Sequence, residues 1–115
     1  MANSHAGRTA AACLRAWTRG DLEQARSFLH DDVTFRGPLG ATDGADAYVD
    51  GIRPLSQMVD PVEPQLVIAD GDDACLIYDL VVQGTTVPTV GCYHLRDGKI
   101  ASIRAYFDPR PLLGG

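Results

Sequence analysis

Asp79 is the residue whose position in this sequence most needs a chemical explanation. It is the only charged residue between Ala74 and Gln83, a stretch with the composition of a buried strand. An unpaired carboxylate is costly to bury, so a buried Asp79 must be protonated or have a partner. A carboxyl with a raised pKa can act as a general acid or base on a ligand proton. Alternatively, Asp79 faces solvent, or it forms a structural ion pair with Arg36 or Arg53.

The other groups that could do chemistry are isolated from one another. His94 falls on the strand face that we expect to point outward, and Asp108 lies just beyond the last strand. Cys13, Cys75 and Cys92 have no Cys-x-x-Cys spacing, so we expect small buried side chains in a reducing cytosol rather than a disulfide framework or a zinc site. We therefore expect no metal and no cofactor.

The length and charge of the chain limit what kind of protein it is. Its 115 residues suit one domain, spanning residues 1–115. A net charge of −5 argues against a nucleic-acid partner or an anionic membrane surface, because both require clustered Lys and Arg. The start of the sequence lacks the pattern of a signal peptide, and no apolar run is long enough to span a membrane. The predicted location is cytoplasmic.

The first half of the chain has the periodicity of helices. Apolar residues spaced three and four apart predict helices over residues 6–19, 22–29 and about 44–59, with a short strand over 33–36. Pro54 is unfavourable inside the third helix, so we expect a kink or a break there.

The second half has the alternation and the turns of strands. Strands are predicted over residues 65–69, 74–83 and 87–95, and a last strand follows the Asp97-Gly98 turn and ends at Phe107. The turn before residue 87 is predicted to occupy residues 84–86. Helices followed by a strand meander predict an α+β fold, with the helices on one face of a mostly antiparallel sheet.

Three segments resemble a known superfamily. AWTRGDLEQARSFLHDDVTF is similar to the opening of nuclear transport factor 2-like proteins, Gly44 matches the entry to their third helix, and DGKIASIRAYFD is similar to their closing strand. The nearest branch is that of the SnoaL-like and limonene-epoxide-hydrolase-like proteins. The resemblance implies a cone-shaped α+β fold, an apolar pocket between about three helices and the concave sheet face, and a homodimer formed through the convex face.

The resemblance also implies which side chains line the pocket. Alternation on the strands, registered by their turns, places Asp79 inward together with apolar neighbours. The expected ligand-binding residues are Leu14, Trp17, Phe35, Tyr48, Ile52, Met58, Ile77, Val81, Val87, Thr89, Tyr93, Ile103, Ala105 and Phe107. Such a lining suits a small hydrophobic molecule.

The catalytic residues of the enzymes in this superfamily are mostly absent. Asp79 stands where limonene-epoxide-hydrolase-like proteins have one of two Asp residues, but Ile77 replaces the Arg partner and Ala105 replaces the second Asp. Phe35 and Gly37 replace the Tyr and Asn that hold the water. Polyketide cyclases of the SnoaL type also tend to carry an acid near position 105.

The ketosteroid-isomerase-like pattern is likewise missing, because its base, its second acid and its Tyr correspond to Gly37, Gly91 and Cys13. Two functions therefore stay open. The first, which we favour, is a cofactorless isomerase, cyclase or epoxide-opening enzyme that uses Asp79 as acid or base. The second is a non-catalytic domain that binds a small ligand in the same pocket.

Overall fold

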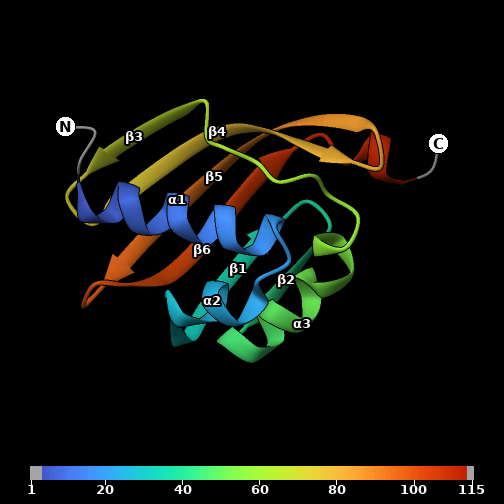
Figure 1. Ribbon diagram of the computed structural model, residues 1–115. Coiled ribbons are helices and arrows are strands. Elements are labelled where there is room, and N and C mark those ends of the chain that lie inside the picture. The colour runs from blue at the N-terminus through green and yellow to red at the C-terminus, as the bar shows by residue number, and fades with distance from the viewer. Residues whose placement is uncertain (1–3, 114–115) are drawn as a thin grey trace.

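The computed structural model describes residues 4–113 of the chain (Figure 1). Two helices, a strand pair and a third helix make up the first half, and strands make up most of the second. The elements are α1 (His5–Thr18), α2 (Leu22–Ser27), β1 (Leu29–Gly37), β2 (Gly40–Asp43), α3 (Ala45–Ser56), β3 (Leu66–Asp70), β4 (Asp73–Val82), β5 (Thr85–Arg96), β6 (Lys99–Phe107) and a short 3-10 helix, η1 (Arg110–Leu112). No helix within residues 4–113 has the length and apolar character needed to cross a membrane.

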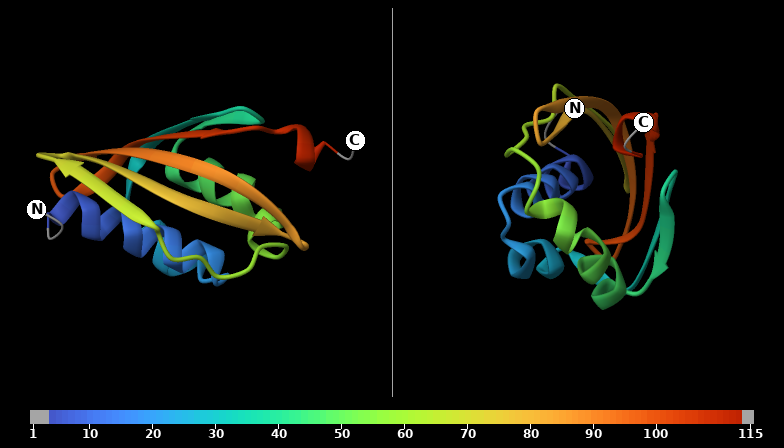
Figure 2. Two further views of the ribbon diagram at one scale, coloured as in Figure 1. Left: turned by 90° about the horizontal axis from the view of Figure 1, so that it is seen from above. Right: turned by 90° about the vertical axis from the view of Figure 1, so that its right-hand side faces the viewer.

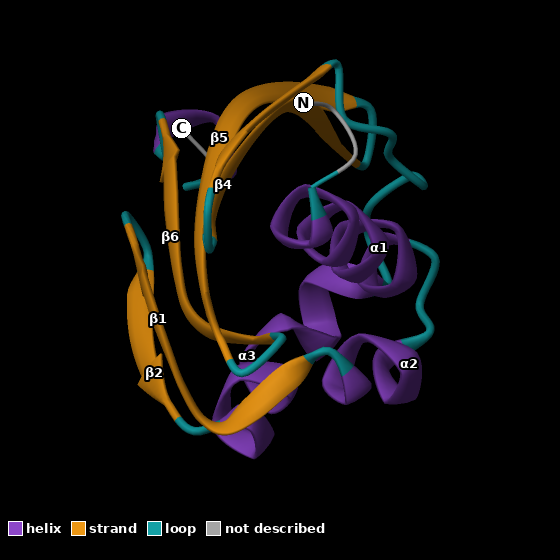
Figure 3. Ribbon diagram, turned by 90° about the vertical axis from the view of Figure 1, so that its left-hand side faces the viewer, coloured by secondary structure: helices purple, strands orange, loops and turns teal. Residues whose placement is uncertain are grey.

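The strands form one sheet in the order β2-β1-β6-β5-β4-β3. Every neighbouring pair is antiparallel except β1 and β6, which are parallel. The sheet curves strongly, and the three helices lie on its concave side (Figures 2 and 3). This arrangement agrees with the predicted α+β architecture of helices on a mostly antiparallel sheet.

Local signals in the sequence explain where the helices begin. The Ser4 side chain accepts a hydrogen bond from the Gly7 amide at the start of α1, and Asp21 accepts one from Gln24 at the start of α2. Both bonds satisfy amides that have no partner inside the helix. The apolar face of α1 then packs on the sheet around fully buried Leu14.

Some element boundaries differ from the prediction. The segment Gly37–Gly40, predicted as a loop, is the turn of a hairpin that joins β1 to β2, a strand the sequence analysis missed. Strand β1 begins at Leu29 rather than residue 33, because Leu29 pairs with Ile100 of β6 before a bulge. Helix α3 continues through Pro54 without a break and ends at Ser56, before the predicted end at residue 59.

The turn between β4 and β5 is the difference with the largest consequence. It contains two residues, Gln83 and Gly84, both with positive φ, and Val82 pairs with Thr85. A two-residue turn of this kind suits Gly and matches the twist of the strands. The prediction used a three-residue turn. Because side chains alternate along a strand, that one-residue difference assigned every β4 side chain to the wrong face.

Candidate functional site

A cavity of about 440 Å³ lies between the concave face of the sheet and the helices. This volume falls within the roughly 300–1,000 Å³ that is usual for small-molecule sites. Its lining comes from α1, α3, η1, the loop after α3 and every strand except β3. The lining residues are Trp17, Phe35, Gly37, Leu39, Gly40, Ala41, Thr42, Tyr48, Gly51, Ile52, Pro54, Leu55, Met58, Tyr78, Leu80, Thr89, Gly91, Tyr93, Ile103, Ala105, Phe107 and Leu112.

Small residues on three adjacent strands form the floor of the cavity. Gly91 of β5 pairs with Ala105 of β6, and a Cβ added to Gly37 of β1 would lie 3.7 Å from the Ala105 Cβ. Aromatic rings cover both glycines. A Cβ on Gly37 would come within 2.9 Å of the Phe35 ring, and one on Gly91 within 3.0 Å of the Tyr93 ring. The absence of side chains at the two glycines therefore lets the rings of Phe35 and Tyr93 lie close to the sheet below the cavity.

Three tyrosines supply most of the polar groups of the cavity. Tyr48 comes from α3, Tyr78 from β4 and Tyr93 from β5, and each is about 5% exposed or less. Within residues 4–113 their hydroxyl groups make no hydrogen bond to a side chain or to the backbone, and none of the three oxygens is a fully buried atom without a partner, so the hydroxyls are open to the cavity. A ligand or water in the cavity must therefore satisfy them.

Two threonines and an aromatic pair complete the lining. Thr89 donates to the Val87 carbonyl at 2.9 Å, so its hydroxyl oxygen can accept a bond from the cavity. Among the described residues, the Thr42 hydroxyl is the one buried side-chain polar atom without a partner. The rings of Phe35 and Tyr48 pack with centroids 5.4 Å apart, which joins β1 to α3 across the cavity wall.

Burial keeps the phenols of the cavity protonated. Burial raises the pKa of Tyr48, Tyr78 and Tyr93, and the proximity of ionisable neighbours, among them Cys13, raises each further. The lining contains no Asp, Glu, His, Lys or Arg. At neutral pH the cavity therefore offers hydrogen-bond donors in an apolar setting and no charged acid or base.

These shifts predict how stability depends on pH. The folded pKa of each phenol lies above its unfolded value of about 10, so the stabilising contribution is complete below about pH 10 and is lost as the pH rises further. In a Tyr106→Phe variant only the three cavity tyrosines remain. We expect tyrosinate absorbance to appear in this variant only as the fold is lost, followed in parallel by circular dichroism. Ionisation near pH 10 with the fold intact would contradict the burial argument.

The structure brings most of the predicted pocket residues together. Ten of them line the cavity: Trp17, Phe35, Tyr48, Ile52, Met58, Thr89, Tyr93, Ile103, Ala105 and Phe107. Leu14 and Val87 do not, because both are fully buried in the core that surrounds it. Ile77 and Val81 were assigned to the wrong face. They lie on the convex side of β4, while Tyr78 and Leu80 point into the cavity.

The predicted inward position of Asp79 is wrong for the same reason. Its strand alternates between fully buried residues on the even-numbered positions and half-buried ones on the odd-numbered positions. Asp79 thus lies on the convex face, where the Gln65 amide donates a hydrogen bond to it at 3.0 Å. Neither Arg36 nor Arg53 pairs with it, since these bind Asp43 and Asp50. Asp79 has no contact with the cavity through which to act on a ligand there.

Replacing Asp79 should therefore have little effect. In Asp79→Asn the Gln65 amide can still donate to the side-chain oxygen, so we expect the free energy of unfolding to change by less than about 0.5 kcal/mol. Binding of a ligand in the cavity should be unchanged. Urea denaturation measures the free energy of unfolding, and calorimetry measures the affinity. A severalfold loss of affinity would show that Asp79 takes part in ligand binding.

The remaining titratable candidates also lie outside the cavity. His94 is on the convex face, as predicted, with Nδ1 2.7 Å from an Asp73 oxygen. The Arg110 guanidinium binds Asp108 in a bidentate pair and lowers the pKa of that carboxyl to about 2, so Asp108 does not turn into the pocket. Within residues 4–113 no group of three or more His, Cys, Asp or Glu residues is arranged to hold a metal ion.

The residues that complete the cavity on two sides were not predicted from the sequence. On β4 these are Tyr78 and Leu80, and the signal for them was Asp79 itself: in a sheet buried on one face, the polar position of an apolar strand marks the solvent side. The residues of β2, including Thr42, were missed because that strand was predicted as a loop. Leu112 was missed because no helix was predicted beyond Phe107.

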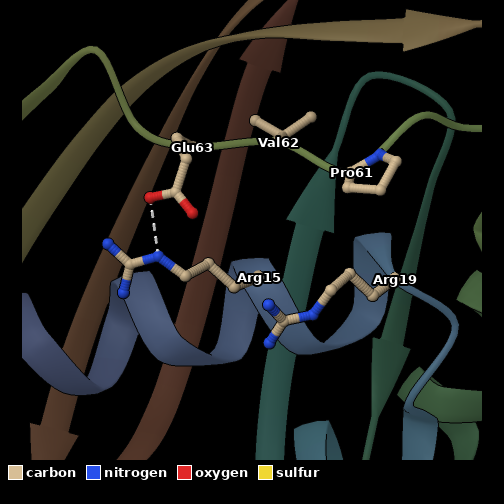
Figure 4. Close-up of a pocket in the computed structure, with 5 residues that line it drawn as sticks. All are labelled: Arg15, Arg19, Pro61, Val62 and Glu63. Carbon is tan, nitrogen blue, oxygen red and sulfur yellow. Dashed lines mark hydrogen bonds and ion pairs between the residues drawn. The ribbon is translucent and has the colours of Figure 1, made fainter.

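A second, smaller depression of about 70 Å³ lies between α1 and the segment 61–63 (Figure 4). Arg15 on α1 donates to Glu63 at 2.7 Å across it, and Thr18 accepts a hydrogen bond from the Val62 amide. These contacts fasten the loop after α3 to the helix. The depression is therefore a gap where the loop packs on α1, and the large cavity is the candidate site.

The combination of a curved sheet, three covering helices and a largely apolar cavity between them defines a cone-shaped α+β fold. The chain belongs to the SnoaL-like domain family, which matches residues 10–103. It is similar to a nuclear transport factor 2-like protein of unknown function from Cytophaga hutchinsonii, with 31% sequence identity, a TM-score of 0.83 and 94% of each chain covered. The predicted family and fold are confirmed.

Two further solved structures extend this comparison. A protein from Kribbella flavida is 28% identical, with a TM-score of 0.86 over 94% of this chain and 90% of that one. An LEH-like epoxide hydrolase from M. tuberculosis is 22% identical, with a TM-score of 0.77 over 96% and 87% of the chains. No curated protein matches the sequence significantly. The fold family includes isomerases, cyclases and epoxide hydrolases, so the fold alone does not select an activity.

Proposed function

We propose that this protein binds a small, largely hydrophobic molecule that carries an oxygen acceptor, such as a ketone, in the cavity between the sheet and the helices. The observation that carries the proposal is the set of three protonated tyrosine hydroxyls, without protein partners, in an otherwise apolar lining. An acceptor in the ligand would receive the hydrogen bonds that these hydroxyls offer to the cavity. The apolar walls would supply most of the affinity, and the phenols would orient the ligand.

The test compares two probes that share one ring skeleton, the ketone 9-fluorenone and the hydrocarbon fluorene. Trp17 is the single tryptophan and lines the cavity, so its fluorescence reports binding. The triple variant Y48F/Y78F/Y93F keeps the apolar walls but removes all three donors. We expect the ratio of fluorenone to fluorene affinity to fall about tenfold in this variant, while fluorene still binds. An unchanged ratio would contradict the role of the phenols.

A second candidate is an enzyme that needs only hydrogen-bond donation, and the protonated phenols favour it. In an isomerisation or cyclisation, charge develops on a carbonyl oxygen, and fixed donors stabilise that charge in a site that excludes water. This version replaces the acid–base role predicted for Asp79, which lies on the other face of the sheet. Turnover of a cyclisable polyketide-like substrate that is lost in the triple variant would support it over simple binding.

We further propose that the chain forms a homodimer through the convex face, and that it is cytoplasmic. A row of paired apolar residues, Leu66, Ile77, Val90 and Tyr106, crosses four strands of this face. Leu66 and Tyr106 are 49% and 53% exposed, and such patches mark interaction sites. Sedimentation at tens of micromolar should give a dimer that Val90→Arg dissociates, because the new charge would be buried unpaired. A wild-type monomer would contradict this.

A further inference from the structure

Cys75 and Cys92 lie directly opposite each other on the convex face, although 17 positions separate them in the sequence. They form a registered pair between β4 and β5, and their Sγ atoms are 3.0 Å apart. Both are half-buried in the single chain, so small molecules can reach them while the convex face is not covered by a second copy, as at low micromolar concentration. The two-residue turn at Gln83 and Gly84, which sets the facing of the β4 side chains, also brings the two cysteines together. With a three-residue turn the two side chains would point to opposite sides of the sheet.

We propose that Cys75 and Cys92 form a reversible disulfide across the β4–β5 pair, by exchange with a small-molecule disulfide such as glutathione disulfide. Residues directly opposite in an antiparallel pair have Cα atoms roughly 4.5–5.5 Å apart, and disulfides span Cα distances of about 4.4–6.8 Å. The bond therefore requires side-chain rotation and little movement of the backbone. Neither the fold nor the cavity has to change for it to form.

The exchange proceeds in two balanced steps. A thiolate of Cys75 attacks one sulfur of the glutathione disulfide, which forms a mixed disulfide and releases one glutathione thiolate. The Cys92 sulfur then attacks the Cys75 sulfur and displaces the second glutathione. The two protein thiols are oxidised, the glutathione disulfide is reduced, and both thiol protons end on the two released glutathione molecules. A dithiol such as dithiothreitol reverses the reaction.

The two Sγ atoms are 3.0 Å apart, so either sulfur can attack a mixed disulfide on the other, and the surroundings of Cys92 favour it for the second step. Burial, and then the hydrogen bond and charge of Cys75, raise the pKa of Cys92 to about 11, so Cys92 is a poor first nucleophile at neutral pH. Arg104, its partner on β6, opposes that shift and supplies a positive charge beside the reacting sulfurs. Cys92 is thus suited to the second step, where it attacks a sulfur that is already in place.

Cys13 provides an internal reference. It is 1% exposed, burial raises the pKa of its thiol to about 12, and its sulfur lies 3.8 Å from the Ala25 carbonyl oxygen. It should remain a thiol throughout, because it neither reaches solvent nor forms a thiolate under native conditions. Of the three cysteines, the chain should therefore lose two thiols together and keep the third.

The experiment incubates reduced wild-type protein at low micromolar concentration with glutathione disulfide, alkylates it after denaturation and measures intact mass. We expect one alkylation instead of three, the loss of two hydrogen atoms, a single-chain band on a non-reducing gel, and a Tm higher by about 5 °C or more that dithiothreitol reverses. The variants Cys75→Ser and Cys92→Ser should not gain this stability: Cys92→Ser should stop at the mixed disulfide on Cys75, and Cys75→Ser should form a mixed disulfide much more slowly. Three alkylations, a persistent mixed disulfide in the wild type or a covalent dimer would each overturn the proposal.

Discussion

Ala105→Trp should abolish binding of fluorenone while the protein still folds. Ala105 lies in the row of small residues at the cavity floor, between Gly37 and Gly91. An indole at this position projects into the space that a ligand would occupy. Because that space is a cavity of about 440 Å³ rather than packed core, the larger side chain need not displace its neighbours. We expect calorimetry to show affinity at least tenfold weaker, which corresponds to about 1.4 kcal/mol or more.

The matched control places the same side chain on the other face of the same strand. Tyr106 follows Ala105, points to the convex side and is 53% exposed. Tyr106→Trp should leave fluorenone binding unchanged. If Ala105→Trp proves too large to fold, Ala105→Leu tests the same space with a smaller loss of affinity expected. Wild-type affinity in both floor variants would show that the ligand site lies elsewhere.

Leu14→Ala should cost about 2–5 kcal/mol of the free energy of unfolding without weakening the binding of fluorenone. Leu14 is fully buried on α1, and it packs in the core beside the cavity rather than lining it. Truncation removes apolar contacts and leaves a void that the surrounding core fills only in part. Urea denaturation measures the loss, and calorimetry at a temperature where the variant is folded measures the affinity.

Leu113→Ala removes the same atoms from a side chain that is 65% exposed, and it should change stability by less than about 0.5 kcal/mol. Comparing Leu14→Ala with Leu113→Ala shows whether Leu14 supports the core or binds the ligand. A Leu14→Ala variant that keeps wild-type stability but loses affinity at least tenfold would reverse the assignment.

The sequence predicted the fold well because its signals are local. The Asp97-Gly98 turn and the alternation that ends at Phe107 both depend on neighbouring residues. The family resemblance covered most of the chain and is confirmed. Strand β2 was missed because its four residues pair with β1 through a tight turn that carries little apolar signal.

The candidate site was predicted only in part, because the length of the turn between β4 and β5 decides which face of the sheet each β4 side chain occupies. Val87, Thr89, Gly91 and Tyr93 were given the correct face, and the structure pairs them with β6 beyond a bulge between His94 and Leu95. The face of β4 depended on whether two or three residues form the turn at Gly84. An almost uniformly apolar strand provides no second signal to correct that choice, so Asp79 was moved inward and Tyr78 outward.

The presence of Tyr78 rather than Asp79 in the cavity changes the chemistry that the cavity can perform. With Asp79 inside, the site would contain a carboxyl able to move a proton. With Tyr78 inside, it contains three phenols that stay protonated and donate hydrogen bonds. The same inversion moves Cys75 next to Cys92, so one turn determines both the polarity of the cavity and the redox chemistry proposed for the convex face.

The central claim is that the cavity binds a hydrophobic ligand whose oxygen accepts hydrogen bonds from its tyrosines. The most direct measurement is a crystal structure of the protein with fluorenone. It should show the ring system between Trp17 and the floor at Ala105, with the carbonyl oxygen within hydrogen-bonding distance of the hydroxyl of Tyr48, Tyr78 or Tyr93. Fluorenone bound on the convex face, or bound in the cavity with its oxygen directed away from all three hydroxyls, would contradict the claim.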